Sequence, residues 1–254
     1  MSELWAACAP ELELVRLRRS FYRVVESQEQ VATNSLVKDL REQSVLEQML
    51  EQTKPSLRPG AEKLHYLLAT PFRYPPLRHG SRFGARHEPS LLYGALQKRT
   101  AFAETAYYRL LFWYGMSTPP GHKLVTQHTV FSAACNTEKG LRLEQPPCQQ
   151  FESYLRDPAS YAATQSLGSA MRGSGVLAFT YRSARDHRAG LNIALFEPQA
   201  LSSRKPTSQQ NWLCETNGDS VSFSFRYSLS GGERYFHYPL EQFLVDGKLP
   251  HPAV

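Results

Sequence analysis

Three arginines lie close together in a segment whose part from Tyr74 to Gly84 cannot be helical. Arg73, Arg78 and Arg82 surround a Pro-Pro step and two glycines in "TPFRYPPLRHGSRFG", residues 70–84. Proline fixes its own φ angle and restricts the residue before it, so the segment is predicted to be extended and turning. A rigid turn of this kind suits phosphate binding, because guanidinium groups donate two parallel hydrogen bonds. A solvated loop with structural salt bridges is the alternative, and this segment alone leaves both open.

A carboxylate follows in "LLYGALQKRTAFAETAYYRLL", residues 91–111. Tyr93 ends a predicted strand, and Glu104 lies in the first turns of a predicted helix. A capping box would place its acid three residues after Thr100, where the chain has alanine, so Glu104 is not simply a box partner. Glu104 shares a helix face with Tyr107 and Tyr108, one turn further on. It is either an acid favoured by the helix dipole or a half-buried carboxylate with a chemical role.

The third stretch is "FTYRSARDHRAGLNIALF", residues 179–196. An apolar strand is predicted to run into a basic turn and to leave it through Gly190 into another strand. Ser183 and Asn192 fall at the two strand ends, where side chains can face a cleft. A plain hairpin loop with solvent-facing charges explains the stretch equally well in isolation.

Common nucleotide-binding and hydrolase motifs are absent from the sequence. There is no P-loop, no G-x-G-x-x-G after a strand, no H-E-x-x-H and no G-x-S-x-G. The eight histidines show no ligand spacing and the four cysteines form no C-x-x-C pair, so no metal site is predicted.

Composition indicates a folded protein with an affinity for anions. A hydrophobic content of 41% with 13 tyrosines and 13 phenylalanines predicts a real core. The net charge of +6 favours nucleotides, nucleic acid or an acidic protein without choosing among them. No apolar stretch reaches the ~20 residues of a membrane helix. Because acidic residues interrupt the N-terminus before any apolar run, no signal peptide is expected. We therefore expect a cytoplasmic protein with reduced thiols and no membrane contact.

The N-terminal part is predicted to be helical. Leu14, Leu17, Phe21, Val24 and Val25 recur at helical spacing, and Pro10 is suited to open that helix. A second helix is predicted from an N-cap at Ser35 through Leu50. The segment "KPSLRPGA", 54–61, breaks helix twice and is predicted to be a linker. We expect residues 1–60 to form a helical extension, with this linker at its end, and residues 62–254 to form the catalytic domain.

Short apolar runs alternate with turn signals after the linker. Strands are predicted at 64–69, 90–96, 122–135, 175–181, 191–196, 211–216 and 221–227, and helices at 98–115 and 158–172. Many strands with few, irregularly placed helices predict an α+β fold with a mixed, mostly antiparallel sheet.

Taken together, the three polar stretches resemble the RES domain family. The resemblance rests on "PFRYPPL-x-x-GSRFG", "LLYGAL" followed by "AFAE", and "YRSAR-x-x-x-G-x-N-x-A-L-F", and it covers residues 64–200. Two departures are the N-terminal 60 residues and the absence of a proline before the serine in "YRSAR". The family is similar to ADP-ribosyltransferases in fold, and its members act as bacterial toxins that consume NAD+ or transfer its ADP-ribose.

The resemblance implies a role for individual residues of this chain. It makes Glu104, Arg73 and Ser183 catalytic. It places Arg73, Arg82, Tyr93, Ser183 and Asn192 around a bound NAD+, with Asn192 at a less diagnostic position. Arg78 is expected to be an exposed surface charge.

These residue types suit cleavage of the nicotinamide–ribose bond. The leaving pyridine is neutral, so no general acid is required, and the transition state is an oxocarbenium-like ribose, as in glycoside hydrolysis. Glu104 would stabilise the developing positive charge. Arg73 and Arg82 would hold the pyrophosphate, Tyr93 would face nicotinamide, and Ser183 would bond the ribose or a phosphate.

The acceptor stays open at this point. Water needs no special site, whereas inorganic phosphate as co-substrate would be attracted by the turn of Arg182, Arg185 and Arg188. A mono-ADP-ribosyltransferase modifying a protein is the alternative, but "AFAE" has no acid or glutamine two residues before Glu104. A non-catalytic basic nucleic-acid-binding module is a third interpretation.

The expected partners follow mostly from the resemblance. They are NAD+ as substrate and a helix-turn-helix antitoxin that covers the cleft, with nucleic acid contacted only through that antitoxin. The N-terminal helices offer an apolar surface for the antitoxin or for a homodimer.

Overall fold

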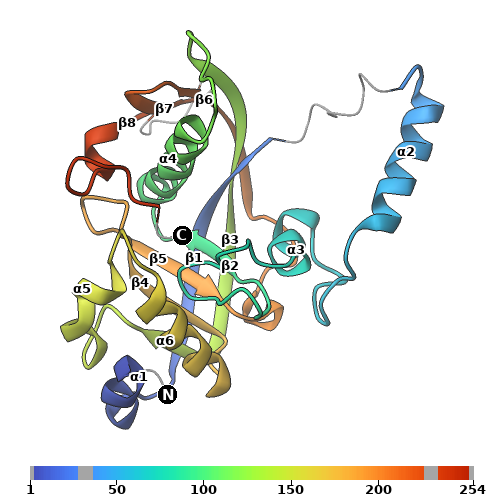
Figure 1. Ribbon diagram of the computed structural model, residues 1–254. Coiled ribbons are helices and arrows are strands. Elements are labelled where there is room, and N and C mark those ends of the chain that lie inside the picture. The colour runs from blue at the N-terminus through green and yellow to red at the C-terminus, as the bar shows by residue number, and fades with distance from the viewer. Residues whose placement is uncertain (1–2, 28–36, 226–233, 252–254) are drawn as a thin grey trace.

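The computed structural model describes residues 3–27, 37–225 and 234–251, which are arranged around one eight-stranded sheet (Figure 1). Its strands are β1 (Val15–Glu26), β2 (Leu92–Ala95), β3 (Leu124–Arg142), β4 (Ala178–Arg182), β5 (Leu191–Leu195), β6 (Ser208–Thr216), β7 (Ser220–Ser224) and β8 (Tyr235–Pro239). The strand order is β1-β2-β5-β4-β3-β6-β7-β8, and β1 also pairs with β3. The first five strands of that order therefore close into a ring. Only β3 and β4 pair in parallel, which confirms the predicted α+β class with a mostly antiparallel sheet.

The predicted helix at 14–25 is wrong, because these residues lie in β1. The strand pairs with β3 from Val15 opposite Gly140 to Glu26 opposite His128. Leu17 and Phe21 are both buried, and a spacing of four residues suits either a helix face or a strand face. The valines and aromatics of this segment favour the strand, and the long ladder with β3 decides between the two. Residues 1–60 thus include a strand of the central sheet.

The predicted strand at 64–69 is also wrong, because residues from Tyr66 onward form helix α3 (Tyr66–Arg73). The His65 Nδ1 atom accepts a hydrogen bond from Leu67 N at 3.3 Å and caps the helix. Leu68 and Phe72 bury one face of α3 against the sheet. A short apolar run does not by itself distinguish strand from helix.

The second predicted helix exists as α2 (Leu40–Thr53). Its N-cap is Asp39, whose side chain accepts hydrogen bonds from Arg41 N and Glu42 N. The predicted cap, Ser35, lies outside the described residues. Figure 1 shows α2 standing apart from the sheet, beyond α3.

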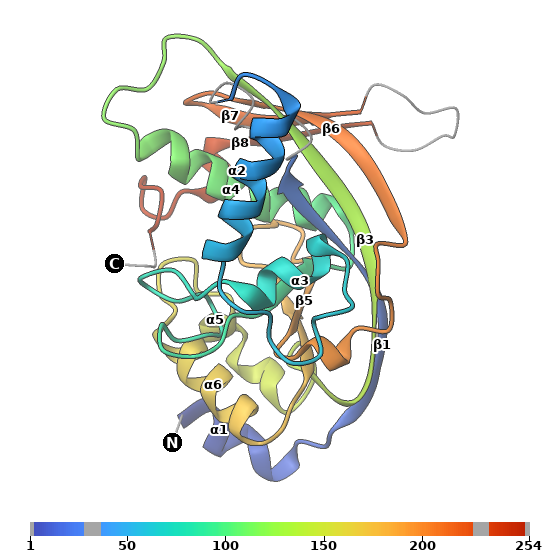
Figure 2. The same cartoon turned by 90° about the vertical axis from the view of Figure 1, so that its right-hand side faces the viewer.

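The remaining helices divide between two regions of the sheet. Helix α4 (Lys98–Tyr114) packs on β6, β7 and β8 through one apolar cluster. Helices α1 (Glu3–Cys8), α5 (Glu152–Leu155) and α6 (Ala162–Gly173) share a second cluster with β4 and β5, and α3 covers the opposite face of the sheet. Short 3-10 helices occur at Ala9–Glu11, Cys148–Phe151, Pro198–Ala200 and Leu240–Phe243. Figure 2 shows the long strands β1 and β3 curving along one side of the molecule.

Candidate functional site

A cavity of about 250 Å³ opens where β1 separates from β2. These two strands pair at one position only, Tyr22 opposite Ala95. The cavity is lined by residues of β1, β2, β4, β5 and α4, by Ser81 and Arg82, and by Tyr161, and it carries both charges and aromatic rings. The tyrosines among its lining residues are Tyr22, Tyr93, Tyr108, Tyr161 and Tyr181, and the charged residues are Arg23, Arg82 and Glu104.

Three of the predicted site residues are joined by hydrogen bonds at this cavity. Ser183 Oγ and Asn192 Nδ2 each donate to Glu104 Oε1 at 2.6 Å. Glu104 comes from the second turn of α4, Ser183 follows β4, and Asn192 lies in β5. Both donors are almost completely buried, whereas Glu104 is half-buried and lines the cavity. Because both bonds fall on Oε1, Oε2 is the carboxylate oxygen left for a bound molecule.

Ser183 is itself held by the backbone of the turn that follows it. Its Oγ accepts hydrogen bonds from Arg185 N and Asp186 N, each at 3.0 Å, so its own proton is directed to Glu104. Its backbone N–H donates to Gly190 O at 2.8 Å, which fixes the end of β4 against the start of β5. The carboxylate is therefore oriented by groups with little freedom to move.

Arg82 lies on a tight turn that is flanked by Gly80 and Gly84. Ser81 and Gly84 pair across this turn, and Gly80 has φ of +74°, where a side chain would be strained. Helix α6 approaches so closely that a Cβ atom at Gly168 would lie 2.0 Å from Phe83 O. The turn is thus held by its own backbone pairing and by its contact with α6, and it places Arg82 in the cavity wall.

The Arg82 guanidinium is bound by neutral groups. Nη1 donates to Leu155 O at 3.3 Å and to Asp157 O at 2.9 Å, and the group lies 4.5 Å from the Tyr161 ring centroid. Within the described residues Arg82 makes no ion pair. Its positive charge is therefore available to an anion in the cavity.

Tyr93 is held in the cavity wall through its hydroxyl. The Oη atom bonds Ser81 Oγ at 2.8 Å and accepts from Phe83 N at 3.0 Å. Burial raises the pKa of Tyr93 to about 12, so the side chain is neutral at physiological pH. These bonds also attach β2 to the turn that carries Arg82.

A second cavity arginine, Arg23, was not singled out from the sequence. It lies on β1, and its Nη1 donates to Tyr93 O at 2.7 Å, which bridges the gap between β1 and β2. Its Nε is buried without a hydrogen-bond partner in the described structure. Burial lowers the pKa of Arg23 to about 10, which still leaves it charged. Because these residues were predicted to be helical, no signal in the sequence alone connected Arg23 to Glu104.

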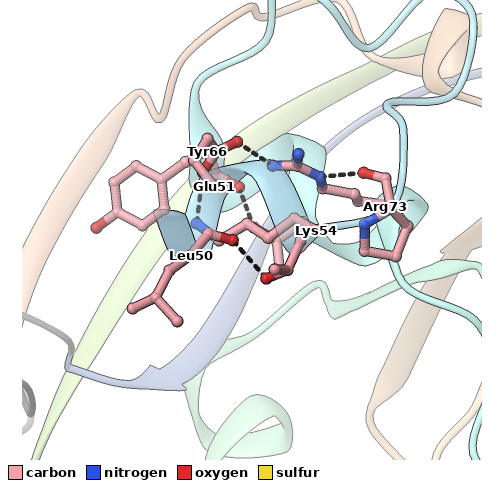
Figure 3. Close-up of polar contacts among 8 residues, drawn as sticks. Leu50, Glu51, Lys54, Tyr66 and Arg73 are labelled. Atoms are coloured by element: carbon pink, nitrogen blue, oxygen red, sulfur yellow. Dashed lines mark hydrogen bonds and ion pairs between the residues drawn. The ribbon is translucent and has the colours of Figure 1, made fainter. Parts of the chain in front are cut away.

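Arg73 is not brought to the cavity. It ends α3, where its Nε donates to Pro55 O at 2.6 Å and its Nη1 pairs with Glu51 Oε1 of α2 at 2.7 Å. Figure 3 shows the Arg73 guanidinium directed toward Glu51. The side chain that was expected to hold a ligand instead attaches α2 and the following linker to α3.

The basic turn after β4 is also mostly engaged within the protein. Arg185 is buried, with its guanidinium carbon 3.5 Å from the Tyr107 ring centroid, and Arg182 Nε lies 3.6 Å from Glu152 Oε2. Only Arg188 of the three arginines is exposed. The arrangement does not form the phosphate-attracting cluster expected from the sequence.

The described part of the chain lacks a metal-binding cluster and a membrane-spanning helix. Within residues 3–27, 37–225 and 234–251, no group of three or more histidine, cysteine, aspartate or glutamate side chains is placed to hold a metal ion. In the same part of the chain, no helix has the length and apolar character needed to cross a membrane.

Comparison with known proteins identifies the family. A model of the RES domain matches residues 58–217, which is more than half of the chain, so the protein belongs to the RES domain family. Among solved structures, the chain is similar to one in the crystal structure of the M. tuberculosis MbcT–MbcA toxin–antitoxin complex. The two are 9% identical with a TM-score of 0.45, and the match covers 78% of this chain and 85% of that one. No curated protein matches this sequence.

Proposed function

We propose that this protein cleaves the nicotinamide–ribose bond of NAD+ and acts as the toxin of a toxin–antitoxin system. The observation that carries the proposal is the position of Glu104, which lines the same cavity as Arg82 and Tyr93 and is oriented by Ser183 and Asn192. Family membership is consistent with this activity.

In this proposal Glu104 stabilises the reacting ribose. As the bond between the anomeric carbon and the pyridinium nitrogen breaks, the electron pair goes to nicotinamide and positive charge develops on the ribose. Oε2 of Glu104 would accept hydrogen bonds from ribose hydroxyls and face that charge at close range. The fixed orientation of the carboxylate means that little reorganisation is needed during the reaction.

The two cavity arginines would bind the pyrophosphate. Arg82 makes no ion pair in the described structure, and Arg23 has a buried Nε without a partner. Bound phosphate oxygens would supply the acceptors that these guanidinium groups lack. Arg23 thereby takes the place that the sequence interpretation gave to Arg73. The tyrosines of the wall would contact the nicotinamide and adenine rings.

Transfer of ADP-ribose to a protein is the weaker alternative. The side chain two residues before Glu104 is Phe102, which is fully buried against α4's partner strands. That position therefore cannot present an acid to an incoming protein side chain.

An antitoxin that covers the cavity is the expected protein partner of a toxin of this kind.

Product analysis tests the proposal and identifies the acceptor. The purified protein is incubated with NAD+ in the presence and absence of inorganic phosphate, and nicotinamide and the ADP-ribose product are separated by chromatography. Free ADP-ribose would indicate hydrolysis, a phosphorylated product would indicate phosphorolysis, and label retained on protein would indicate transfer. Absence of nicotinamide release under all conditions would refute the proposal.

A further inference from the structure

A basic groove lies on the face of the sheet that α3 covers, away from the cavity lined by Glu104, Arg82 and Tyr93, which we call the dinucleotide cavity. Its lining comes from the segment before α3 and from the loop before β6, and it consists of Lys63, His65, Ser203, Arg204, Lys205, Pro206 and Thr207. In Figure 2 the loop leading into β6 runs alongside β3. The dinucleotide cavity lies on the opposite face of the sheet. Asn192 of β5 lines that cavity, whereas its neighbours Ile193 and Leu195 point to the other face and pack toward α3.

The two halves of the basic groove are fixed to each other and to the sheet. His65 N donates to Arg204 O at 2.8 Å, which joins the two segments. Ser203 Oγ accepts from Ala134 N at 3.1 Å, and Thr207 N donates to Ser132 O at 2.8 Å. The cationic side chains are thus held near one another by a rigid backbone.

Nearby acids do not neutralise the basic groove. Within the described residues, Lys63, Arg204 and Lys205 make no ion pair. The acid beside Lys63, Glu62, accepts from Gly60 N at 2.9 Å, and Glu197 lies within 3.7 Å of Arg58 and Arg172. Clustered like charges repel, so an external anion would relieve that repulsion.

The chemistry of the lining favours a phosphate backbone over a protein. Pro206 is the only apolar side chain in the lining, whereas protein partners are usually anchored by buried apolar or aromatic residues. The hydroxyl of Ser203, which only accepts from Ala134 N, and the Nε2 atom of His65, whose Nδ1 is used as a helix cap, add uncharged donors suited to phosphate oxygens.

One further arginine, Arg19, extends the basic surface across the sheet. Arg19 of β1 pairs with Cys135 of β3, which in turn is bridged to Leu201 at the start of the basic loop. Arg19 is exposed, shares its strand face with Leu17 and Phe21, and donates from Nη1 to Arg18 O at 2.9 Å. Two strand spacings separate Arg19 from Leu201, a span of ~10 Å. A chain of several phosphates can follow such a track, whereas a single small anion cannot.

We propose that the basic groove binds the phosphate backbone of a nucleic acid directly, at a site separate from the dinucleotide cavity. This adds a direct contact to the indirect one, through an antitoxin, that the sequence interpretation expected. The lining supplies charged and uncharged donors that suit phosphate oxygens. The basic groove is therefore expected to bind without sequence preference.

The test measures binding of a fluorescently labelled single-stranded RNA 12-mer to the full chain by anisotropy, between 50 and 200 mM salt. The variant removes three cations of the groove, as K63A/R204A/K205A. The matched control, R78A/R86A/K248A, removes three exposed cations elsewhere, so both variants lose equal charge. The log–log salt slope is about −0.7 per phosphate contacted on a single strand, so the groove variant should lose about 2 from its magnitude. Its affinity at 50 mM salt should fall by on the order of 10²-fold, against a few-fold for the control.

Several results would overturn the proposal. They are equal loss in the two triple variants, an unchanged salt slope in the groove variant, or no binding by the wild type at 50 mM salt. Displacement of the RNA by polyglutamate at equal charge concentration would show instead a surface for acidic proteins. Nicotinamide release by K63A/R204A/K205A reports on the cavity separately, and it should match the wild type whether or not RNA binds.

Discussion

Replacing Arg82 by alanine should weaken NAD+ binding strongly while leaving the fold intact. The guanidinium makes no ion pair in the described structure and is supported by two backbone carbonyls and the Tyr161 ring. A hydrogen bond to a charged group is worth ~1.5–3 kcal/mol, and loss of that energy corresponds to a rise in KM of about 10- to 150-fold. Arg82→Lys keeps the charge but not the bidentate geometry, so it should fall between alanine and the wild type.

Arg73→Ala is the matched control for this experiment. Arg73 pairs with Glu51, whose side chain is 56% exposed, and such pairs contribute ~0–1 kcal/mol to stability. We expect its KM to remain within about 2-fold of the wild type, because removing a residue outside the cavity costs no substrate contact. The assay is the initial rate of nicotinamide release over a range of NAD+ concentrations, with thermal unfolding of each variant alongside. The reasoning would be refuted if Arg73→Ala raised KM as much as Arg82→Ala did.

Three further outcomes are expected. Ser183→Ala removes one of the two donors to Glu104 and should lower kcat by roughly 10- to 100-fold, measured as nicotinamide release at saturating NAD+. Burial lowers the pKa of His128 to about 4. The free energy of unfolding should therefore be highest above pH ~6.5 and should fall by on the order of 3 kcal/mol as the pH falls toward 4, because the unfolded chain binds the proton first. Urea titrations of His128→Phe should lack this decline. Gly168→Ala places a Cβ against Phe83 O and should cost ~1–3 kcal/mol of stability by denaturant titration, with a raised KM because the Arg82 turn must shift.

The secondary structure predicted from the sequence failed where local pattern and long-range pairing disagree. Residues 14–25 satisfy helical periodicity, but their pairing with β3 is a contact between segments more than a hundred residues apart. Periodicity and propensity within a short window contain no information about so distant a pairing partner. The strands around Tyr93 and Asn192 and the helix of Glu104 were predicted, because turn residues and strong apolar runs delimit them.

The candidate site was predictable to the extent that its residues lie in recognisable motifs. Glu104, Ser183 and Asn192 do meet, and Arg82 and Tyr93 line the same cavity. Arg73 was wrongly predicted to line the cavity. Its position next to the Pro-Pro step does not determine the direction in which its side chain points from α3, and it contacts Pro55 and Glu51 instead. Arg23 was overlooked for the converse reason: its importance arises from the separation of β1 and β2, a property of the assembled sheet.

The most direct test of the account replaces the cavity carboxylate that Ser183 and Asn192 orient. Nicotinamide release by Glu104→Gln is compared with that by the wild type and by Glu241→Gln, which changes an exposed glutamate in the same way. Loss of ~3–4 kcal/mol of transition-state stabilisation predicts a rate lower by a factor of order 10² to 10³ for Glu104→Gln, and an unchanged rate for Glu241→Gln. Equal rates for Glu104→Gln and the wild type would contradict the central claim that this carboxylate faces the reacting ribose.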